Sequence, residues 1–317
     1  MPTSLDCLHA ARAIERPVRL FPGEEPRMGM HGKVVVVTGS NVGIGLETAV
    51  GVAERGATTI LACRNQAKAE AAAKVVTQRT WNDDVHVVAL DLADLASVRK
   101  AAEDIQSRWG RLDVLVNNAG GTWTQRQHTA QGIEYTFGVN HLAHFYLTNL
   151  LLERLRTDTP SRVVSLTSVG HHAAFGGLQF DDLQSEKRYE GMEVYCRSKL
   201  ANVLFVRALA KRLRGSDVTA NAVHPGWVRS SFAMDGDTTG FMGFGMRVIR
   251  PVQISPRRGA KTSVYLATSP DVAGKTGMYW VRSKPGHMSR HARDDAAAER
   301  LWDESERLLA SAGFPLG

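Results

Sequence analysis

The stretch from Lys33 to Gly45 reads K-V-V-V-V-T-G-S-N-V-G-I-G. Its β-branched run, Lys33 to Thr38, is typical of a strand that is buried on both faces of a parallel sheet. The glycines that follow allow the main chain to turn sharply and to approach a ligand closely. Apolar residues then recur at helical spacing from Leu46 to Ala53. The stretch therefore predicts a strand, a tight turn and the beginning of a helix.

A strand that leads through glycines into a helix N-terminus is suited to bind phosphate. The free N–H groups of the first helical turn and the helix dipole both favour an anion there. We therefore expect the turn to hold the phosphates of a nucleotide. The alternative is a glycine-rich turn that binds no ligand.

The alternation of strand and helix continues along the 317 residues of the chain. Further strands are expected at Ala57–Cys63, Val85–Leu90, Arg111–Val116, Ser161–Leu166, Val218–Val223 and Met278–Val281. Long helices are expected at Val139–Arg156 and Glu193–Arg214. This order predicts an α/β fold, a doubly wound parallel sheet (Rossmann fold) of about seven strands with helices on both faces in a single domain.

The end of the second expected strand bears on the choice of cofactor. In a dinucleotide-binding fold this point meets the adenosine ribose, and an acidic residue there would accept the 2′-hydroxyl of NAD. This chain instead has Arg64, with Lys68 one helical turn later. A cation suits the 2′-phosphate of NADP, so we expect NADP(H) to be preferred over NAD(H). The alternative is a solvated surface arginine.

The sequence Tyr195-Cys196-Arg197-Ser198-Lys199 places a phenol and an ammonium group on one face of a helix, about one turn apart. A free tyrosine has a pKa of about 10 and exchanges protons poorly at neutral pH. A neighbouring lysine cation favours the phenolate, so we expect Lys199 to lower the pKa of Tyr195. The pair could therefore transfer protons, although such pairs also occur on ordinary helices.

Several further motifs accompany this pair in a fixed order. They are T-G-x-x-x-G-I-G at 38–45, D-L at 91–92, N-N-A-G at 117–120, Asn140, Ser168, Y-x-x-x-K at 195–199 and P-G-W-V at 225–228. With these motifs the chain resembles the short-chain dehydrogenase/reductase family, from about Lys33 to the C-terminal helix. It is similar to the retinol-dehydrogenase-like branch in four features: Asn41, A-C-R at 62–64, H-H at 171–172 and D-L-Q at 182–184.

The resemblance implies four catalytic residues and a reaction that interconverts an alcohol and a carbonyl by hydride transfer. Ser168 would hydrogen-bond the reacting oxygen of the substrate, and Tyr195 would exchange its proton as general acid or base. Lys199 would lower the pKa of the tyrosine and hold the nicotinamide ribose. Asn140 would position a water that joins Lys199 to solvent.

The resemblance also implies the cofactor site. The phosphates and the adenosine ribose would be held by Gly39, Asn41, Val42, Gly43, Ile44 and Gly45. Asp91 and Leu92 would meet the adenine, and Arg64 the 2′-phosphate. Asn118, Tyr195 and Lys199 would lie along the nicotinamide ribose, and Val228 would contact the nicotinamide amide.

The substrate is expected to be a lipophilic small-molecule alcohol or carbonyl. We expect residues 1–30 to form an N-terminal extension and residues 31–317 the domain, in which the resemblance implies a substrate lid at about 229–256. That segment contains Phe232, Met234, Phe241, Met242, Phe244 and Met246. Such side chains build adaptable apolar walls. Retinoids, steroids, fatty aldehydes and polyketide-like ketones all remain open as substrates, and a packed core loop is the alternative. The 26 residues between Ser168 and Tyr195 are expected to line the same pocket.

The sequence argues against several other kinds of protein. The formal net charge is +7, but the arginines are scattered. The densest basic cluster, at 247–261, has no interleaved aromatic residue, which predicts a solvated face and no nucleic-acid partner. We also expect no metal site, because His171 and His172 should point in different directions and His224 precedes Pro225 in what should be a structural turn.

Location and assembly follow from cysteine usage and from the resemblance. The three cysteines are widely spaced, which predicts a reduced, cytoplasmic compartment. No apolar run approaches the roughly 18 residues of a transmembrane span. A weak stripe at Leu5, Leu8 and Ile14 favours a lid on the body over a membrane helix, and weak peripheral membrane association stays open. The resemblance implies a homodimer or homotetramer built on the helices near Asn140 and Tyr195.

The alternative function is a catalytically silent NADP(H)-binding interaction or sensor protein.

Overall fold

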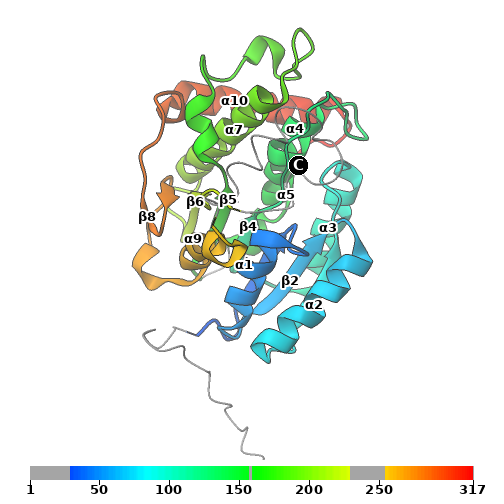
Figure 1. Ribbon diagram of the computed structural model, residues 1–317, viewed down its shortest axis with the longest axis vertical. Coiled ribbons are helices and arrows are strands. Elements are labelled where there is room, and N and C mark those ends of the chain that lie inside the picture. The colour runs from blue at the N-terminus through cyan, green and yellow to red at the C-terminus, as the bar shows by residue number, and fades with distance from the viewer. Residues whose placement is uncertain (1–28, 157–158, 229–253, 317) are drawn as a thin grey trace, which may run out of the picture.

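A computed structural model of the chain describes residues 29–156, 159–228 and 254–316. Within these residues one sheet has eight strands in the order β3-β2-β1-β4-β5-β6-β7-β8 (Figure 1). The bounds are β1 Val34–Thr38, β2 Thr58–Cys63, β3 Val85–Ala89, β4 Val114–Asn117, β5 Ser161–Leu166, β6 Val218–His224, β7 Tyr279–Val281 and β8 Lys284–Pro285. The strands from β1 to β7 are parallel. The predicted doubly wound α/β fold is confirmed, with one strand more than expected because β8 adds a short antiparallel pair with β7.

Helices cover both faces of this sheet (Figure 1). One face carries α1 (Gly43–Ala53), α2 (Gln66–Thr80) and α9 (Pro256–Thr268). The other carries α3 (Leu95–Arg108), α5 (Ala143–Leu150) and α7 (Gly191–Arg212), with α10 (Asp295–Ser311) packed on α7. The valine run of β1 lies between the two layers: Val35 and Val37 face α1 and α9, whereas Val36 faces the other core. All three are fully buried, as the β-branched run predicts.

The sheet has its topological switch point between β1 and β4. From β1 the chain proceeds outward to β2 and β3 on one side, and later to β4, β5 and β6 on the other. The connections leaving the carboxyl ends of β1 and β4 therefore diverge and open a crevice, where ligands bind in folds of this class. The glycine turn follows β1 and the N-N-A-G motif spans the end of β4, so both predicted cofactor motifs meet at this crevice.

The long helix expected at Val139–Arg156 is interrupted. It is divided into α4 (Tyr135–Phe137), a π-helical turn η1 (Gly138–Leu142), α5 and α6 (Leu152–Leu155). The π turn contains Asn140, whose side chain is bonded on two sides, and such turns are frequent at functional sites. Apolar periodicity could not locate the break, because every residue of the π turn is buried. The helix expected at Glu193–Arg214 is confirmed as α7.

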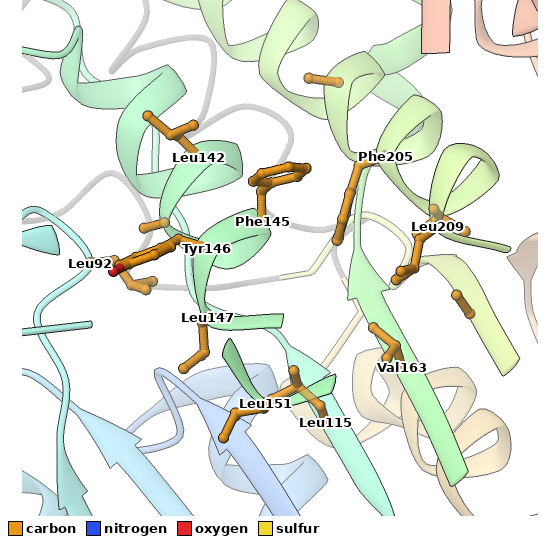
Figure 2. Packing of buried hydrophobic residues seen from close by; sticks show 14 of the residues in the cluster. Leu92, Leu115, Leu142, Phe145, Tyr146, Leu147, Leu151, Val163, Phe205 and Leu209 are labelled. Atoms are coloured by element: carbon orange, nitrogen blue, oxygen red, sulfur yellow. The ribbon is translucent and has the colours of Figure 1, made fainter. Parts of the chain in front are cut away.

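The C-terminal helix α10 covers the helices that the resemblance implies as association surfaces. Figure 2 shows Phe145 of α5 and Phe205 of α7 facing one another in the core. Trp302 of α10 packs edge to face on Phe145, at 4.8 Å between ring centroids. Ser305 of α10 lies 3.0 Å from the Nε2 atom of His141. The dimer or tetramer stays a prediction, and these helix faces are already occupied by the chain's own α10.

Two predicted segments fall outside the described residues. They are residues 1–28 of the N-terminal extension and residues 229–253 of the expected lid. Among the residues that are described, no helix combines the length and the apolar character needed to cross a bilayer.

We expect Trp302→Ala to lower the free energy of unfolding by about 3–5 kcal/mol, because it removes a large buried side chain and leaves a cavity. Trp302 is only 7% exposed and also lies under the Arg212 guanidinium. The measurement is urea unfolding followed by circular dichroism. Trp81→Ala is the matched control, because Trp81 is 78% exposed. Equal shifts in both variants would show that α10 adds no packing energy at this position.

Candidate functional site

The turn after β1 is tight because glycine stands at three of its positions. Gly39 and Gly43 have φ angles of +63° and +64°, in the left-handed region that side chains disfavour. A Cβ atom on Gly45 would lie 2.4 Å from the Gly39 carbonyl oxygen. A Cβ on Gly43 would meet no atom within 4 Å, so this side of the turn is open.

The N-terminus of α1 opens into the crevice with its first N–H groups available. Its N-cap residue, Val42, makes no side-chain capping hydrogen bond, and the first turn holds no acidic residue. Helix dipole and N–H groups together favour an anion at such an end.

The ends of β1 and β4 are joined by side-chain hydrogen bonds. The Thr38 Oγ1 atom accepts the backbone N–H groups of Asn118 and Ala119, at 2.9 and 3.0 Å. The Asn118 amide nitrogen donates to the Thr38 carbonyl at 2.8 Å. The Asn118 Oδ1 atom is buried and has no partner among the described residues.

A cleft of about 1000 Å³ occupies this edge of the sheet. It brings together all the positions expected to bind the cofactor: Gly39, Asn41, Val42, Gly43, Ile44, Gly45, Arg64, Asp91, Leu92, Asn118, Tyr195, Lys199 and Val228. Ser168 lines the same cleft. Of the four expected catalytic residues, only Asn140 does not line the cleft.

Asn140 lies behind the cleft-lining residue Gly121 and is fully buried. Its Oδ1 accepts the Gly121 N–H at 2.8 Å, and its Nδ2 donates to the Gly121 carbonyl and to the Ser198 Oγ, each at 2.9 Å. The side chain thus ties the segment after β4 to α7. The water-positioning role of Asn140 stays a prediction.

Burial sets the protonation of the tyrosine–lysine pair. The Lys199 Nζ atom lies 5.6 Å from the ring centroid of Tyr195. Burial lowers the pKa of Lys199 to about 8. Burial also raises the pKa of Tyr195 to about 12, and the hydrogen bond with Ser168 offsets only part of this rise. The expectation that Lys199 holds the tyrosine pKa below its usual value was wrong for this geometry, because desolvation of the phenolate dominates.

Ser168 has its hydrogen-bonding direction set by its own loop. It caps the short 3₁₀ helix η2 (Val169–Ala173), and its Oγ atom accepts the Gly170 N–H at 3.1 Å. A hydroxyl that accepts this bond keeps its proton available for donation. Gly170 itself lies against Ser168 and Tyr195, since a Cβ there would be 3.5 Å from the Tyr195 ring.

Arg64 lines the cleft at the end of β2, where the sequence predicts the adenosine ribose of a cofactor to lie. It follows β2 directly, is exposed, and donates a hydrogen bond of 3.3 Å to the Tyr135 hydroxyl. Lys68 lines the same part of the cleft.

The aromatic wall formed by Trp123 and Tyr135 was not predicted from the sequence. The two rings pack edge to face at 4.6 Å, and both residues line the cleft. The Tyr189 hydroxyl donates to the Trp123 carbonyl at 2.9 Å. The T-W-T sequence directly after the N-N-A-G-G run was the available signal, because the chain leaves β4 there at the crevice.

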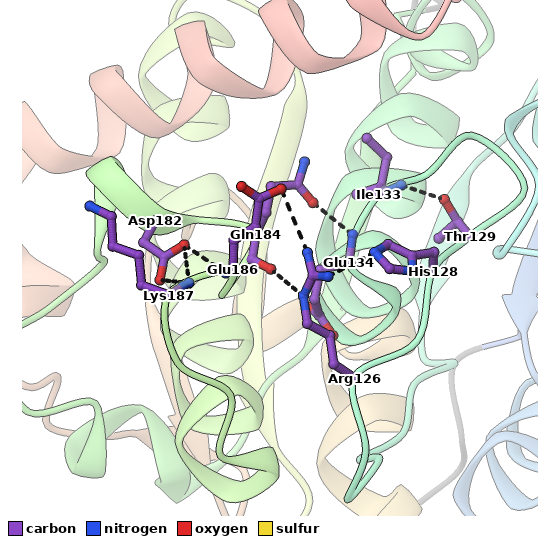
Figure 3. A network of polar contacts seen from close by, with 9 residues as sticks. All are labelled: Arg126, His128, Thr129, Ile133, Glu134, Asp182, Gln184, Glu186 and Lys187. Carbon is purple, nitrogen blue, oxygen red and sulfur yellow. Dashed lines mark hydrogen bonds and ion pairs between the residues drawn. The ribbon is translucent and has the colours of Figure 1, made fainter.

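The segment between Ser168 and Tyr195 supports this wall from behind. The expectation that it lines the pocket was wrong for the described residues, because none of 169–194 borders the cleft. Figure 3 shows how it holds the wall segment: the Gln184 Oε1 accepts the Glu134 N–H, and Arg126 donates to the Gln184 carbonyl, at 2.7 and 3.1 Å. Arg126 also pairs with Glu186 at 3.7 Å.

The histidines near Ser168 lie closer together than expected. The ring centroids of His171 and His172 are 4.0 Å apart at an interplanar angle of 43°, although His171 is buried and His172 is exposed. The described part of the chain contains no group of three or more histidine, cysteine or acidic side chains arranged to hold a metal ion.

Comparison with known proteins places this geometry in a family. The family model described as short chain dehydrogenase matches residues 33–180. Retinol dehydrogenase 12 of Homo sapiens is 46% identical over 278 residues, which cover 88% of this chain and 86% of that protein. The chain belongs to the short-chain dehydrogenase family. Its sequence places it in the retinol-dehydrogenase-like branch, since retinol dehydrogenase 14 of Homo sapiens is 39% identical over 93% of this chain and 91% of that protein.

Solved structures agree with this assignment. A crystal structure of an uncharacterized protein from Mycobacterium paratuberculosis has a TM-score of 0.73 and 34% identity, over 92% of this chain and 97% of that one. The RhlG/NADP active-site complex of Pseudomonas aeruginosa has a TM-score of 0.63 and 27% identity, over 81% and 96%. This short-chain dehydrogenase is therefore an oxidoreductase whose site is built for a nicotinamide cofactor.

The residues of this short-chain dehydrogenase fit such a cofactor. The open side of Gly43, the uncapped start of α1 and the orphaned Asn118 Oδ1 lie along one cleft, next to the Lys199 ammonium. Phosphates suit the helix N-terminus, and a ribose hydroxyl suits an unpaired carbonyl oxygen.

We expect Gly45→Ala to abolish measurable binding of NADPH by this dehydrogenase, because the added Cβ would lie 2.4 Å from a main-chain oxygen and 2.5 Å from Asn118 Nδ2. Isothermal titration calorimetry measures the affinity. Gly110→Ala is the control, because a Cβ there meets no atom within 4 Å. Wild-type affinity in Gly45→Ala would contradict the close packing of this turn.

Proposed function

We propose that this protein is an NADP(H)-dependent oxidoreductase that interconverts a lipophilic alcohol and its carbonyl, with Tyr195 as general acid and base. The observation that carries the proposal is that Ser168, Tyr195 and Lys199 share one cleft with the phosphate-binding turn. A bound nicotinamide cofactor supplies or accepts the hydride. The protein must then orient the substrate and handle one proton.

Tyr195 and Ser168 act on the same substrate oxygen. With its pKa raised to about 12 by burial, Tyr195 is protonated at neutral pH and can donate its proton as negative charge develops on a carbonyl oxygen. Ser168 Oγ accepts the Gly170 N–H and hydrogen-bonds Tyr195, so both hydroxyls lie together and can donate to the same substrate oxygen. Two donors fixed in a buried site stabilise an alkoxide without reorganisation.

Lys199 restores the proton of Tyr195 and holds the nicotinamide ribose in this proposal. Burial lowers its pKa to about 8, close enough to neutrality for it to release and regain a proton. A Cβ on Gly120 would lie 3.2 Å from Nζ and 2.7 Å from the Asn140 Oδ1. Asn140 would complete the path to solvent.

Arg64 supports a preference for NADP(H) over NAD(H). It is the charged residue at the end of β2, and the Tyr135 hydroxyl holds its guanidinium at the cleft. A guanidinium at this place matches a 2′-phosphate in charge and geometry.

The substrate class follows from the relatives and from the surface beside the catalytic residues. The curated relatives are named retinol dehydrogenases, which supports a retinoid or a similarly lipophilic alcohol or aldehyde. Trp227 is an exposed large apolar residue next in the chain to Val228, which lines the cleft. A cytoplasmic location is proposed from the cysteines, of which Cys63 and Cys196 are free.

We expect Tyr195→Phe to lower kcat about 10²- to 10⁴-fold, the usual contribution of a positioned acid or base. The measurement is NADPH oxidation with a panel of lipophilic aldehydes and ketones that includes retinaldehyde. Affinity for NADPH should change little, because the ring is retained. Tyr265→Phe is the matched control, because Tyr265 lies on α9 outside the cleft.

Two outcomes of this panel separate the function classes. Unchanged kcat in Tyr195→Phe would refute the proposed acid/base role. NADPH binding without turnover of any carbonyl would support the catalytically silent binding or sensor protein instead.

We expect Arg64→Ala to weaken NADPH binding about tenfold or more and to leave NADH binding nearly unchanged, because a charge-assisted bond to the 2′-phosphate is lost. Lys74→Ala is the control for the change in net charge, because Lys74 is exposed on α2 and does not line the cleft. Equal losses for both cofactors would refute the role of Arg64.

A further inference from the structure

Two histidines hold the main chain of the loop that carries Ser168. The Nδ1 atom of His171 lies 2.7 Å from the Ser168 carbonyl oxygen, and the Nδ1 atom of His224 lies 3.2 Å from the Val169 backbone nitrogen. The Gly170 N–H in turn donates to the Ser168 Oγ. The Ser168 carbonyl, the Val169 N–H and the Gly170 N–H, three groups close together along the main chain, are therefore all held by hydrogen bonds. Both histidines are buried.

The partners of each ring fix its tautomer. A carbonyl oxygen only accepts, so the Nδ1 atom of His171 carries the proton. The other nitrogen of His171, Nε2, faces the Ser289 backbone N–H at 3.3 Å and must therefore be the acceptor. His224 has the opposite arrangement, because its Nδ1 accepts the Val169 N–H and its proton is on Nε2. Both rings are neutral in this network, with different tautomers.

The surroundings favour the neutral form of both rings. The titratable and charged groups that face them are His172, His287, Tyr279 and Arg282. Burial, with smaller effects from the neighbouring cationic groups, lowers the pKa of His171 and of His224 to about 4. Protonation of His171 at Nε2 would set its new N–H against the Ser289 N–H. Protonation of His224 at Nδ1 would likewise set its new N–H against the Val169 N–H.

His171 also links the catalytic loop to a distant part of the chain. Through Ser289 it reaches the segment between β8 and α10, and the Ser289 Oγ accepts the Ala292 N–H there at 3.2 Å. The ring packs edge to face on Tyr279 of β7 at 4.7 Å. The catalytic loop is thus fixed against the edge of the sheet and not only by its own turn.

We propose that His171 and His224 are positioning residues, which as neutral imidazoles of opposite tautomer fix the backbone from Ser168 to Gly170 and so aim the Ser168 hydroxyl at the substrate oxygen. This inference rests on the proposed function for its catalytic consequence. Each histidine acts through Ser168 and not by contact with the substrate oxygen. An error of about 1 Å in the placement of such a donor can cost up to about a hundredfold in rate.

The test for His171 compares three variants with NADPH and the aldehyde that wild-type protein reduces fastest in the panel above. His171→Leu keeps much of the volume but loses both hydrogen bonds, and should lower kcat about tenfold to a hundredfold with little change in the Kd for NADPH. His171→Asn places an amide nitrogen near the position of Nδ1, and should recover most of the loss. His172→Ala, which removes the neighbouring exposed ring, is the control. Wild-type kcat in His171→Leu would overturn the proposal.

A double-mutant cycle tests whether His171 acts through the serine. In a Ser168→Ala background, His171→Leu should lower kcat by less than twofold, because the hydroxyl that it aims is absent. If the loss from His171→Leu is as large in that background as in the wild type, the positioning role is refuted. The corresponding pair for His224 is His224→Leu with rescue by His224→Asn, whose Oδ1 can accept the Val169 N–H.

A spectroscopic measurement is independent of turnover. The ¹⁵N chemical shifts of labelled histidines should show a protonated Nδ1 in His171 and a protonated Nε2 in His224, with neither ring titrating between pH 5.5 and 7.5, as the pKa values of about 4 require. The opposite tautomer in either ring, or titration near pH 6.5, would overturn the inference. If the predicted tautomers are found while no carbonyl is reduced, the proposed function fails but the histidine bridges stand.

Discussion

The hydrogen bonds between Thr38 and the segment after β4 are the interaction on which the site depends. Thr38 Oγ1 accepts two backbone N–H groups and the Thr38 carbonyl accepts the Asn118 amide, so the divergent ends of β1 and β4 cannot separate. The same bonds bring Gly39 against Ala119, where a Cβ would be 2.8 Å from the alanine Cβ. Without these hydrogen bonds the glycine turn and the proposed catalytic residues beyond β4 would not face the same cleft.

Burial shifts the pKa values of the titratable groups that line this cleft. Desolvation raises the pKa of Tyr195 to about 12 and lowers that of Lys199 to about 8, and in both cases it favours the neutral form. At neutral pH the phenol of Tyr195 is therefore protonated, the form from which the proposed reaction would donate a proton to a carbonyl oxygen.

The sequence was sufficient for the layout and insufficient for what depends on packing. The valine run, the glycine turn and the strand ends at Arg64 and Asp91 are local signals, and the parallel sheet follows from their alternation. The pKa of Tyr195 was predicted in the wrong direction because charge spacing along a helix is visible in a sequence, whereas desolvation is not. The break at the π turn and the covering of α5 by α10 were missed for the same reason, since each arises from contacts between distant segments. The Asn140 side chain, for example, bonds Gly121 and Ser198.

The segment from Gly120 to Tyr135 connects the two ends of the cleft. At one end Asn140 clamps Gly121 on both its N–H and its carbonyl, beside the Lys199 ammonium. At the other end Tyr135 accepts the hydrogen bond from Arg64. Between them Trp123 folds onto Gly121, where a Cβ would be 2.5 Å from the indole. Because one supported wall contacts both Arg64 and the surroundings of Lys199, a change that displaces it should, under the proposed function, disturb cofactor recognition and proton transfer together.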